Sequence, residues 1–370
     1  MKRLSIIALT VVLAASSFLY CVESPAMKGA RLYYRDRQYP EAKEQLTIVM
    51  DREPDNAEAP YLMGEIYFNE RDYETGNKYF DMCLAISDKY RGNIMQSRDR
   101  VFGQYFNGAV RIMNNAQREE NEELKTESLE RLIVEAERAL VVRKEERAYD
   151  IIGSAYIMLN NIDKACEYFI EALKLNPESR NALQQLGYMN YSKAIQANNN
   201  EALLLEAIKY WEQLVEKYPE TKPRTLDLGY AYELTNQMDK AIVFYDDLLT
   251  EHSDNVFLLT QLGAVKYNTG DQEGAEELFK KALEYDPENV TVLHNIADPM
   301  FVGFLDKMRG GEQVPQEDWE AILPYFEELS VLDAENAQVW DFLSVVYIRL
   351  EMLDKADAAA AKAKELKEIK

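Results

Sequence analysis

Beyond residue 23, apolar residues recur at spacings of three and four in short stretches that polar turns separate. This spacing is that of one buried face of an α-helix. One segment, residues 259–287, holds two such stretches around the polar turn 268–270 and predicts two helices joined by that turn. Its key positions are Leu259, Leu262, Gly263, Tyr267, Ala275, Phe279, Ala282 and, where the second helix ends, Pro287.

The segment is one copy of an internal repeat. Equivalent residues of successive copies lie 34 positions apart in several independent columns of the sequence. The columns are Gly153 with Gly187, Gly229 with Gly263 and Ala297, Ala241 with Ala275, Tyr245 with Phe279, and Leu248 with Ala282. A fixed period of this length is typical of solenoid architectures, in which each repeat packs on its neighbours.

The repeat resembles the tetratricopeptide repeat, whose pattern has a large apolar residue, Leu-Gly, Tyr, Ala, an aromatic residue, Ala and Pro in that order. This resemblance implies an all-α fold, an α-solenoid coiled as a right-handed superhelix of about nine helix-turn-helix units. In such a unit, Gly263 and Ala275 are small because the two helices cross closely there, and Phe279 fills the space toward the next unit. The units start near Ser24, Ala57, Asn93, Glu146, Arg180, Lys222, Val256, Val290 and Ala337.

The match to the repeat varies along the chain. We expect units one and two in 24–92, an irregular unit with extended helices in 93–145, and four regular units in 146–289. An eighth unit with an insertion spans 290–336, and the last unit and a capping helix span 337–370. The third, fifth and eighth units are longer than the others. We expect their extra residues to emerge at turns as surface excursions, near 119–123, 198–200 and 308–315, because an insertion elsewhere would break the stacked core.

The N-terminus predicts export. Met1-Lys2-Arg3 precede an apolar stretch from Leu4 to Val22, the arrangement of a signal peptide or a membrane anchor. Three interpretations of residues 1–23 stay open: cleavage after Ala26, acylation of Cys21 as in a bacterial lipoprotein, or retention as an anchor. The expected location is the periplasm, or its side of a membrane.

Charge and composition exclude several classes of function. The net charge of −23 and the lack of a basic stripe argue against nucleic-acid binding. Three scattered cysteines without a CxxC pair indicate neither a disulfide framework nor a zinc site. Cys83 and Cys166 are predicted to be small buried side chains, and His252 to complement a helix dipole. Because common enzyme motifs are missing, we expect no catalytic residue, cofactor, metal or small-molecule substrate.

Family resemblance implies that the first helix of each unit lines a concave groove. Counted onto this sequence, the groove is rich in tyrosine, a residue that offers a large contact area and a hydroxyl with few rotatable bonds. Inter-repeat packing is the alternative role for each of these tyrosines. The predicted partner-binding residues are Tyr61, Gln184, Tyr188, Tyr191, Tyr230, Phe257, Tyr267, Asn268, His294 and Phe301.

The groove positions carry almost no basic residue apart from Arg147 and Arg349, which argues against a clamp for a partner's C-terminal carboxylate. A peptide segment or helix with apolar side chains and neutral or basic flanks fits better. The sequence thus predicts a non-enzymatic scaffold that binds another envelope or secreted protein. The alternative is an assembly factor or chaperone for outer-membrane, pilus or secretion-system clients.

Overall fold

The computed structural model describes residues 24–224 and 226–368, so the predictions for residues 1–23, including Cys21, lie outside it. The described residues form 18 α-helices and two short 3-10 helices, and no strand occurs among them. Contacts divide the chain into two units, with the division after Ala182 inside α10. None of the described helices is long and apolar enough to cross a membrane.

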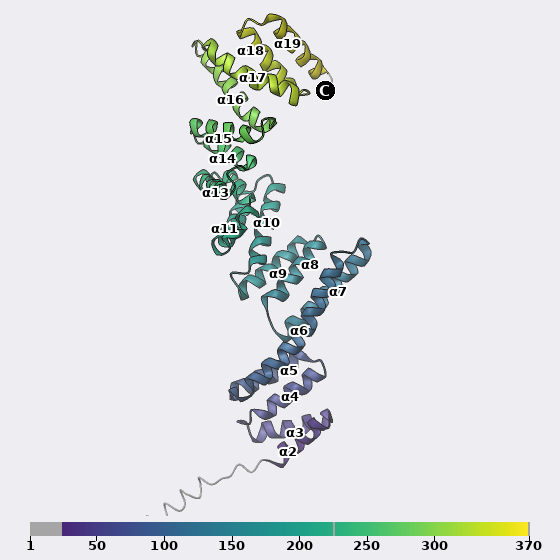
Figure 1. Ribbon diagram of the computed structural model, residues 1–370. Coiled ribbons are helices and arrows are strands. Elements are labelled where there is room, and N and C mark those ends of the chain that lie inside the picture. The colour runs from purple at the N-terminus through teal and green to yellow at the C-terminus, as the bar shows by residue number, and fades with distance from the viewer. Residues whose placement is uncertain (1–23, 225, 369–370) are drawn as a thin grey trace, which may run out of the picture. The chain divides into compact units, whose positions relative to one another are not determined.

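The first unit holds four helix pairs (Figure 1). The pairs are α2 (Pro25–Arg35) with α3 (Tyr39–Arg52), α4 (Glu58–Asn69) with α5 (Tyr73–Ile86), α6 (Arg91–Ala116) with α7 (Glu122–Val142), and α8 (Glu146–Met158) with α9 (Ile162–Leu175). The 3-10 helix η1 (Asp88–Tyr90) leads into α6. Each pair is an A helix followed by a B helix, as the repeat predicts.

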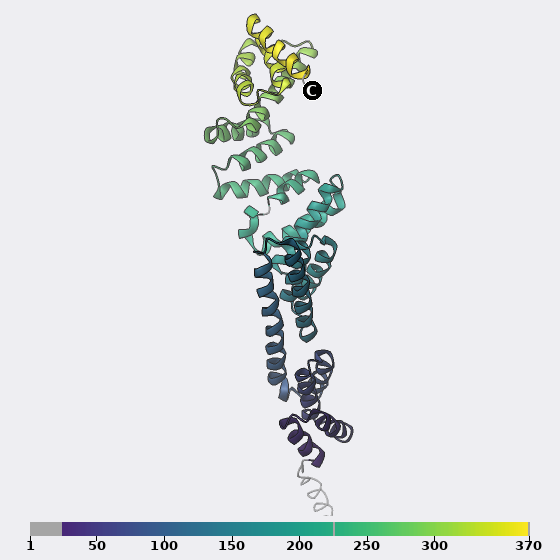
Figure 2. The ribbon, with the colours of Figure 1, turned by 90° about the vertical axis from the view of Figure 1, so that its right-hand side faces the viewer.

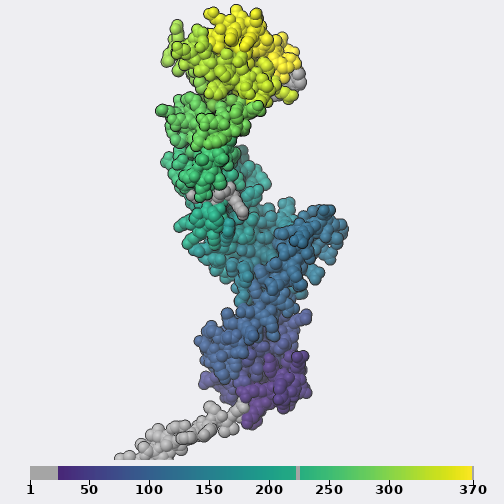
Figure 3. Space-filling model, viewed as in Figure 1, coloured from purple at the N-terminus to yellow at the C-terminus, as the bar shows by residue number. Residues whose placement is uncertain are grey.

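The second unit holds five pairs, beginning with α10 (Arg180–Gln196). The pairs are α10 with α11 (Glu201–Lys217), α12 (Asp227–Leu234) with α13 (Met238–Glu251), α14 (Val256–Asn268) with α15 (Gln272–Tyr285), α16 (Val290–Arg309) with α17 (Gln316–Leu332), and α18 (Ala337–Arg349) with α19 (Leu353–Glu368). The 3-10 helix η2 (Pro219–Arg224) follows α11. The last two pairs share one apolar core and form a single block, yellow-green to yellow in Figure 3. The fold is therefore the all-α solenoid that the sequence predicts.

The conserved spacing of glycine and aromatic positions has a direct packing cause. A Cβ atom on Gly229 would lie 2.5 Å from the Tyr245 hydroxyl oxygen, and one on Gly263 would lie 2.6 Å from the Phe279 ring. Phe279 also shares a buried cluster with Val292 of the following unit. Tyr245 and Phe279 thus each need a glycine on the A helix of their own pair, and Phe279 also fills the space toward the next unit.

The turn between the A and B helices repeats one backbone conformation. Arg37, Arg71, Asn160, Asn236 and Gly270 each have a positive φ, between 55° and 92°, at the same place in their turns. Asparagine and glycine adopt this left-handed region most easily. An Asp or Asn side chain then caps several B helices, as Asp72, Asn161 and Asp271 do.

The three predicted insertion sites are turns, between α6 and α7, between α10 and α11, and between α16 and α17, but these turns hold only part of the extra residues. The extra residues mostly lengthen the paired helices: α6 has 26 residues and α7 has 21, whereas α4, α5 and α9 have 12 to 14. Figure 2 shows the long α6 in blue. Apolar residues such as Ala109, Met113 and Leu132 continue the helical pattern and are buried between α6 and α7. A continued apolar face makes a longer helix more stable than a loop would be.

Candidate partner-binding site

Aromatic side chains from three consecutive A helices of the second unit gather on one face. Tyr230 of α12 lies edge-on to Phe257 of α14, with 6.2 Å between ring centroids. Tyr191 of α10 packs on Trp211 with 5.5 Å between ring centroids. Tyr230 is also close enough to Tyr191 to act electrostatically on its hydroxyl. The rings of Tyr191 and Tyr230 are partly exposed, and Phe257 is 40% exposed. We call these three residues, with Asp227 and Glu233 of α12, the tyrosine face.

Two carboxylates give this face a negative character. Burial raises the pKa values of both Asp227 and Glu233. The Tyr245 hydroxyl donates a hydrogen bond of 2.8 Å to Glu233 Oε1, which lowers the pKa of Glu233 and so opposes the effect of burial. Burial, followed by the nearby carboxylates, raises the pKa values of Tyr191 and Tyr230. Both hydroxyls therefore stay protonated at neutral pH and can donate hydrogen bonds.

The chemistry of the tyrosine face suits a partner with apolar and basic side chains. The helix α12 carries Asp227 and Glu233 and no basic residue. A cation seated beside these carboxylates would also meet the faces of tyrosine rings, and both interactions favour Lys or Arg over acidic residues. These side chains thus have the neutral to acidic character that the sequence predicts for this part of the groove.

Four other predicted residues belong to helices that contribute to the tyrosine face. Gln184 and Tyr188 precede Tyr191 on α10 at helical spacing, so that the three share one side of the helix. Tyr188 is 57% exposed, which leaves most of its ring available. Tyr267 and Asn268 end α14 and are both exposed. Their role in binding stays a prediction.

Tyr61 belongs to the first unit, whereas the other predicted residues belong to the second. Its ring stacks on Tyr90 at 4.5 Å, so internal packing uses much of its surface. Next to it on α4, the carboxylate of Glu65 is buried and accepts a hydrogen bond of 2.5 Å from Ser97 Oγ. Burial raises the pKa of Glu65 and, with Glu65 as a second cause, raises that of Tyr34 to about 12.

The prediction for Phe301 is wrong. Its side chain is 1% exposed and packs against Phe342 at 4.2 Å and Phe326 at 5.7 Å, inside the core of the last two pairs. The lengthened α17 and the following α18 cover this part of α16, which the count of repeat positions could not show.

Both ring nitrogens of His294 contact aspartates of the same chain. Nδ1 lies 3.0 Å from Asp298 Oδ2, and Nε2 lies 3.1 Å from Asp333 Oδ2 at the end of α17. Burial raises the pKa of Asp298, and the proximity of His294 opposes that shift. The residue therefore links α16 to α17, and its predicted contact with a partner stays untested.

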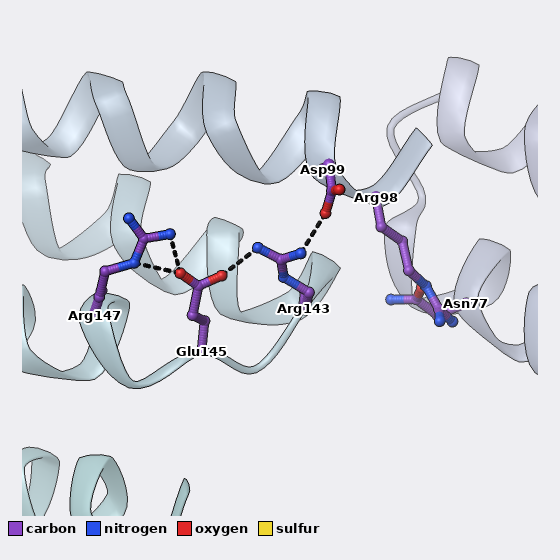
Figure 4. A network of polar contacts seen from close by, with 6 residues as sticks. All are labelled: Asn77, Arg98, Asp99, Arg143, Glu145 and Arg147. Carbon is purple, nitrogen blue, oxygen red and sulfur yellow. Dashed lines mark hydrogen bonds and ion pairs between the residues drawn. The ribbon is translucent and has the colours of Figure 1, made fainter. Parts of the chain in front are cut away.

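Arg147, a basic residue that the sequence predicts at a groove position of the first unit, belongs to a polar network at the junction of α7 and α8. Arg147 and Arg143 both form ion pairs with Glu145, and Arg143 also reaches Asp99 of α6 (Figure 4). The guanidinium of Arg143 lies 4.6 Å from the centroid of the Phe102 ring. Since Arg147 is neutralised by Glu145, it does not act as an isolated cation.

Sequence reasoning missed Asp227 as a member of the site. Its distance of three residues from Tyr230 on a helix was the available signal, but the repeat pattern contains no acidic position there. Cys83 is buried as predicted, whereas Cys166 is partly exposed. In the described residues, no group of His, Cys, Asp and Glu side chains could hold a metal ion.

Comparisons with known proteins agree with the repeat. Tetratricopeptide repeat models match residues 27–89, 146–179, 226–255 and 258–289. The chain is 27% identical to the human mitochondrial import receptor subunit TOM70 over 135 residues, 36% of this chain and 22% of that protein. It is 22% identical to the TPR repeat-containing protein MJ1428 of Methanocaldococcus jannaschii over 206 residues, 52% of this chain and 34% of that one. The chain thus spans about a fifth to a third of the length of these relatives.

Solved structures with a similar fold include YrrB, described as a TPR protein with an unusual peptide-binding site, and yeast Tom70. The match to YrrB has 18% identity and a TM-score of 0.42 and covers 56% of this chain and 96% of that one. The match to yeast Tom70 has 13% identity and a TM-score of 0.37, and it covers 92% of this chain and 84% of that one.

Proposed function

Because this chain is a tetratricopeptide repeat protein, and such repeats form protein-interaction scaffolds, we propose that it binds a segment of a partner protein on the tyrosine face. One observation carries the proposal. Tyr191, Tyr230 and Phe257 come from three successive A helices and stay partly exposed, and two carboxylates lie near Tyr191 and Tyr230. A continuous aromatic and acidic strip can bind an extended segment through several side chains at once.

We propose that the bound segment carries basic residues among apolar ones. The aromatic rings contribute contact area, and Asp227 and Glu233 provide the charge that selects Lys or Arg. The role is binding without catalysis, which is typical of this fold.

We further propose that the protein acts in the bacterial envelope. The support is the positively charged start and the apolar stretch from Leu4 to Val22, in the sequence outside the described residues. Mass spectrometry of the mature protein tests this: a terminus after Ala26 or an acylated Cys21 is expected for an exported form. An intact Met1 would leave only the retained anchor.

The test of binding places a photo-crosslinking amino acid at Tyr188, whose ring is mostly exposed, in the otherwise native full chain. The same chain then carries Tyr191→Ala and Tyr230→Ala. A matched control carries Tyr285→Ala, since this tyrosine is 50% exposed but lies on the B helix α15. Circular dichroism checks that each variant keeps its helices.

Loss of one dominant crosslinked partner in the tyrosine-face variant, and not in the Tyr285→Ala control, would support a scaffold. An unchanged partner in both variants would show that binding does not use the tyrosine face. The alternative function, a chaperone or assembly factor, is favoured by the exposed rings of Tyr188 and Tyr267, which are 57% and 37% accessible. It predicts many weak crosslinks to unfolded exported chains and suppression of their aggregation.

A further inference from the structure

A second surface of the second unit lies between the B helices α11 and α13, away from the aromatic side chains of the tyrosine face. It is a groove with a cavity of about 470 Å³, and the A helix α12 forms its floor. Its apolar lining consists of Val215, Leu228, Tyr232, Val243 and Phe244. We call it the α11–α13 groove.

Val243 departs from the pattern of the other B helices. Five B helices have 14 residues, namely α3, α5, α9, α13 and α15. At the sixth position, the other four carry exposed charged side chains: Glu44, Lys78, Glu167 and Glu277. In α13 this position is Val243, which is 61% exposed. The position that is charged on the other four helices is therefore apolar on α13, where it borders a cavity. No described residue covers the Val243 side chain.

The rim of the groove is acidic. Glu212 and Glu216 of α11 lie on one side, and Asp239 and Asp247 of α13 lie on the other. The one base among the lining residues is Lys240, and its Nζ atom is 2.7 Å from Glu212 Oε1. No ion pair forms to Glu216 or Asp239 within the described part of the chain. The rim therefore keeps excess negative charge around an apolar floor.

We propose that the α11–α13 groove is a second docking site, whose occupant is an amphipathic segment of a partner protein with apolar residues flanked by Lys or Arg. The apolar side chains would cover Val243 and the partly exposed Val215, and the bases would meet the carboxylates of the rim. This site is independent of the tyrosine face, because its residues belong to the B helices and to the opposite side of α12.

The probe is a fluorescent 14-residue peptide of Leu, Ala and Lys, with leucines at helical spacing. Its twin has every Lys replaced by Glu. Fluorescence anisotropy measures binding of each peptide to the full chain at low and at moderate salt. We expect the basic peptide to bind at least tenfold more tightly than the acidic twin, with an affinity that falls as salt rises.

Val243→Gln replaces the exposed apolar side chain with a polar one and leaves the charge of the rim unchanged. It is expected to weaken binding of the basic peptide about tenfold without loss of helix, because the position is exposed and Gln favours helices more than Val. The matched control is Val331→Gln on α17, which makes the same change at a position that is 74% exposed and outside the groove. It should change the affinity less than twofold.

Three results would overturn the proposal: no binding of the basic peptide, equal binding of both peptides, or equal effects of Val243→Gln and Val331→Gln. Tyr230→Ala separates the two sites. If that variant weakens peptide binding and Val243→Gln does not, the peptide binds the tyrosine face and the α11–α13 groove is not a docking site.

Discussion

Asp150 allows a sharp test of how burial acts on this fold. It lies on α8, where its Oδ2 accepts a hydrogen bond of 3.1 Å from Ser179 Oγ. Its Oδ1 is buried and has no hydrogen-bond partner in the described chain. Burial raises the pKa of Asp150 from 3.8 to about 6, opposed by the Ser179 hydrogen bond and increased slightly by Glu146.

The sign of the pH dependence follows from proton binding. A carboxyl group with a higher pKa in the folded chain binds its proton more tightly there than in the unfolded chain. The contribution of Asp150 to the free energy of unfolding is therefore most favourable below pH 4, and it decreases as the pH rises toward 6 and stays lower above it. The difference between 3.8 and about 6 corresponds to about 3 kcal/mol, and partial solvent access lowers this to roughly 1–3 kcal/mol.

The substitution Asp150→Asn keeps the shape and removes the charge. We expect the variant to be more stable than the wild type by roughly 1–3 kcal/mol at pH 8 and nearly equal to it at pH 4. Solenoids need not unfold in one step, so amide hydrogen exchange of α8 and α9 should accompany urea denaturation. Asp55→Asn, at an exposed position before α4, is the matched control and should show no such pH-dependent gain.

The reasoning about Asp150 would be refuted by a variant that is no more stable than the wild type at pH 8. It would also be refuted by a gain of the same size at pH 4 and pH 8, since an effect of charge must disappear when the carboxyl group is protonated.

Two further predictions concern glycines and the polar network. Gly229→Ala should destabilise the second unit by about 1–3 kcal/mol, because the new Cβ would lie 2.5 Å from the Tyr245 hydroxyl oxygen. Gly303→Ala on α16 should instead stabilise this unit by up to about 1 kcal/mol, because its Cβ would meet nothing within 4 Å. Urea denaturation of both variants checks this, and a loss at both positions would contradict it. Glu145→Ala should lower the free energy of unfolding by about 1–2 kcal/mol, because Arg143 and Arg147 lose their shared partner. Glu74→Ala should lower it by less than about 0.5 kcal/mol, because the Lys78–Glu74 pair is well exposed. Hydrogen exchange of α8 compares the two, and equal protection would contradict the difference.

Much of the fold could be predicted because its signals are local in the sequence. The pairing of Gly263 with Phe279 repeats at a constant spacing, so one unit predicts the packing of the others. The insertions were harder to interpret. A turn residue such as Gly311 marks where a helix pair reverses, but the length of α6 depends on which neighbouring helix covers its apolar face.

The candidate site was predictable only in part. Tyr191, Tyr230 and Phe257 lie together as the repeat count implies, but Phe301, at an analogous position, is buried under α17 and α18. The sequence pattern predicts a partner contact for His294 and gives no sign of the two aspartates of the same chain that its ring contacts.

The sequence by itself determined the helical units, their small and large packing positions, and the acidic character of the surface, because helical periodicity and composition are properties of the chain alone. Tertiary structure decided which polar and aromatic side chains are used within the protein and which stay exposed. That choice depends on neighbours distant in sequence: Asp333 holds His294, and the space beside α11 leaves Val243 uncovered. Burial and pairing across repeats therefore distinguish a binding surface from a packing surface here.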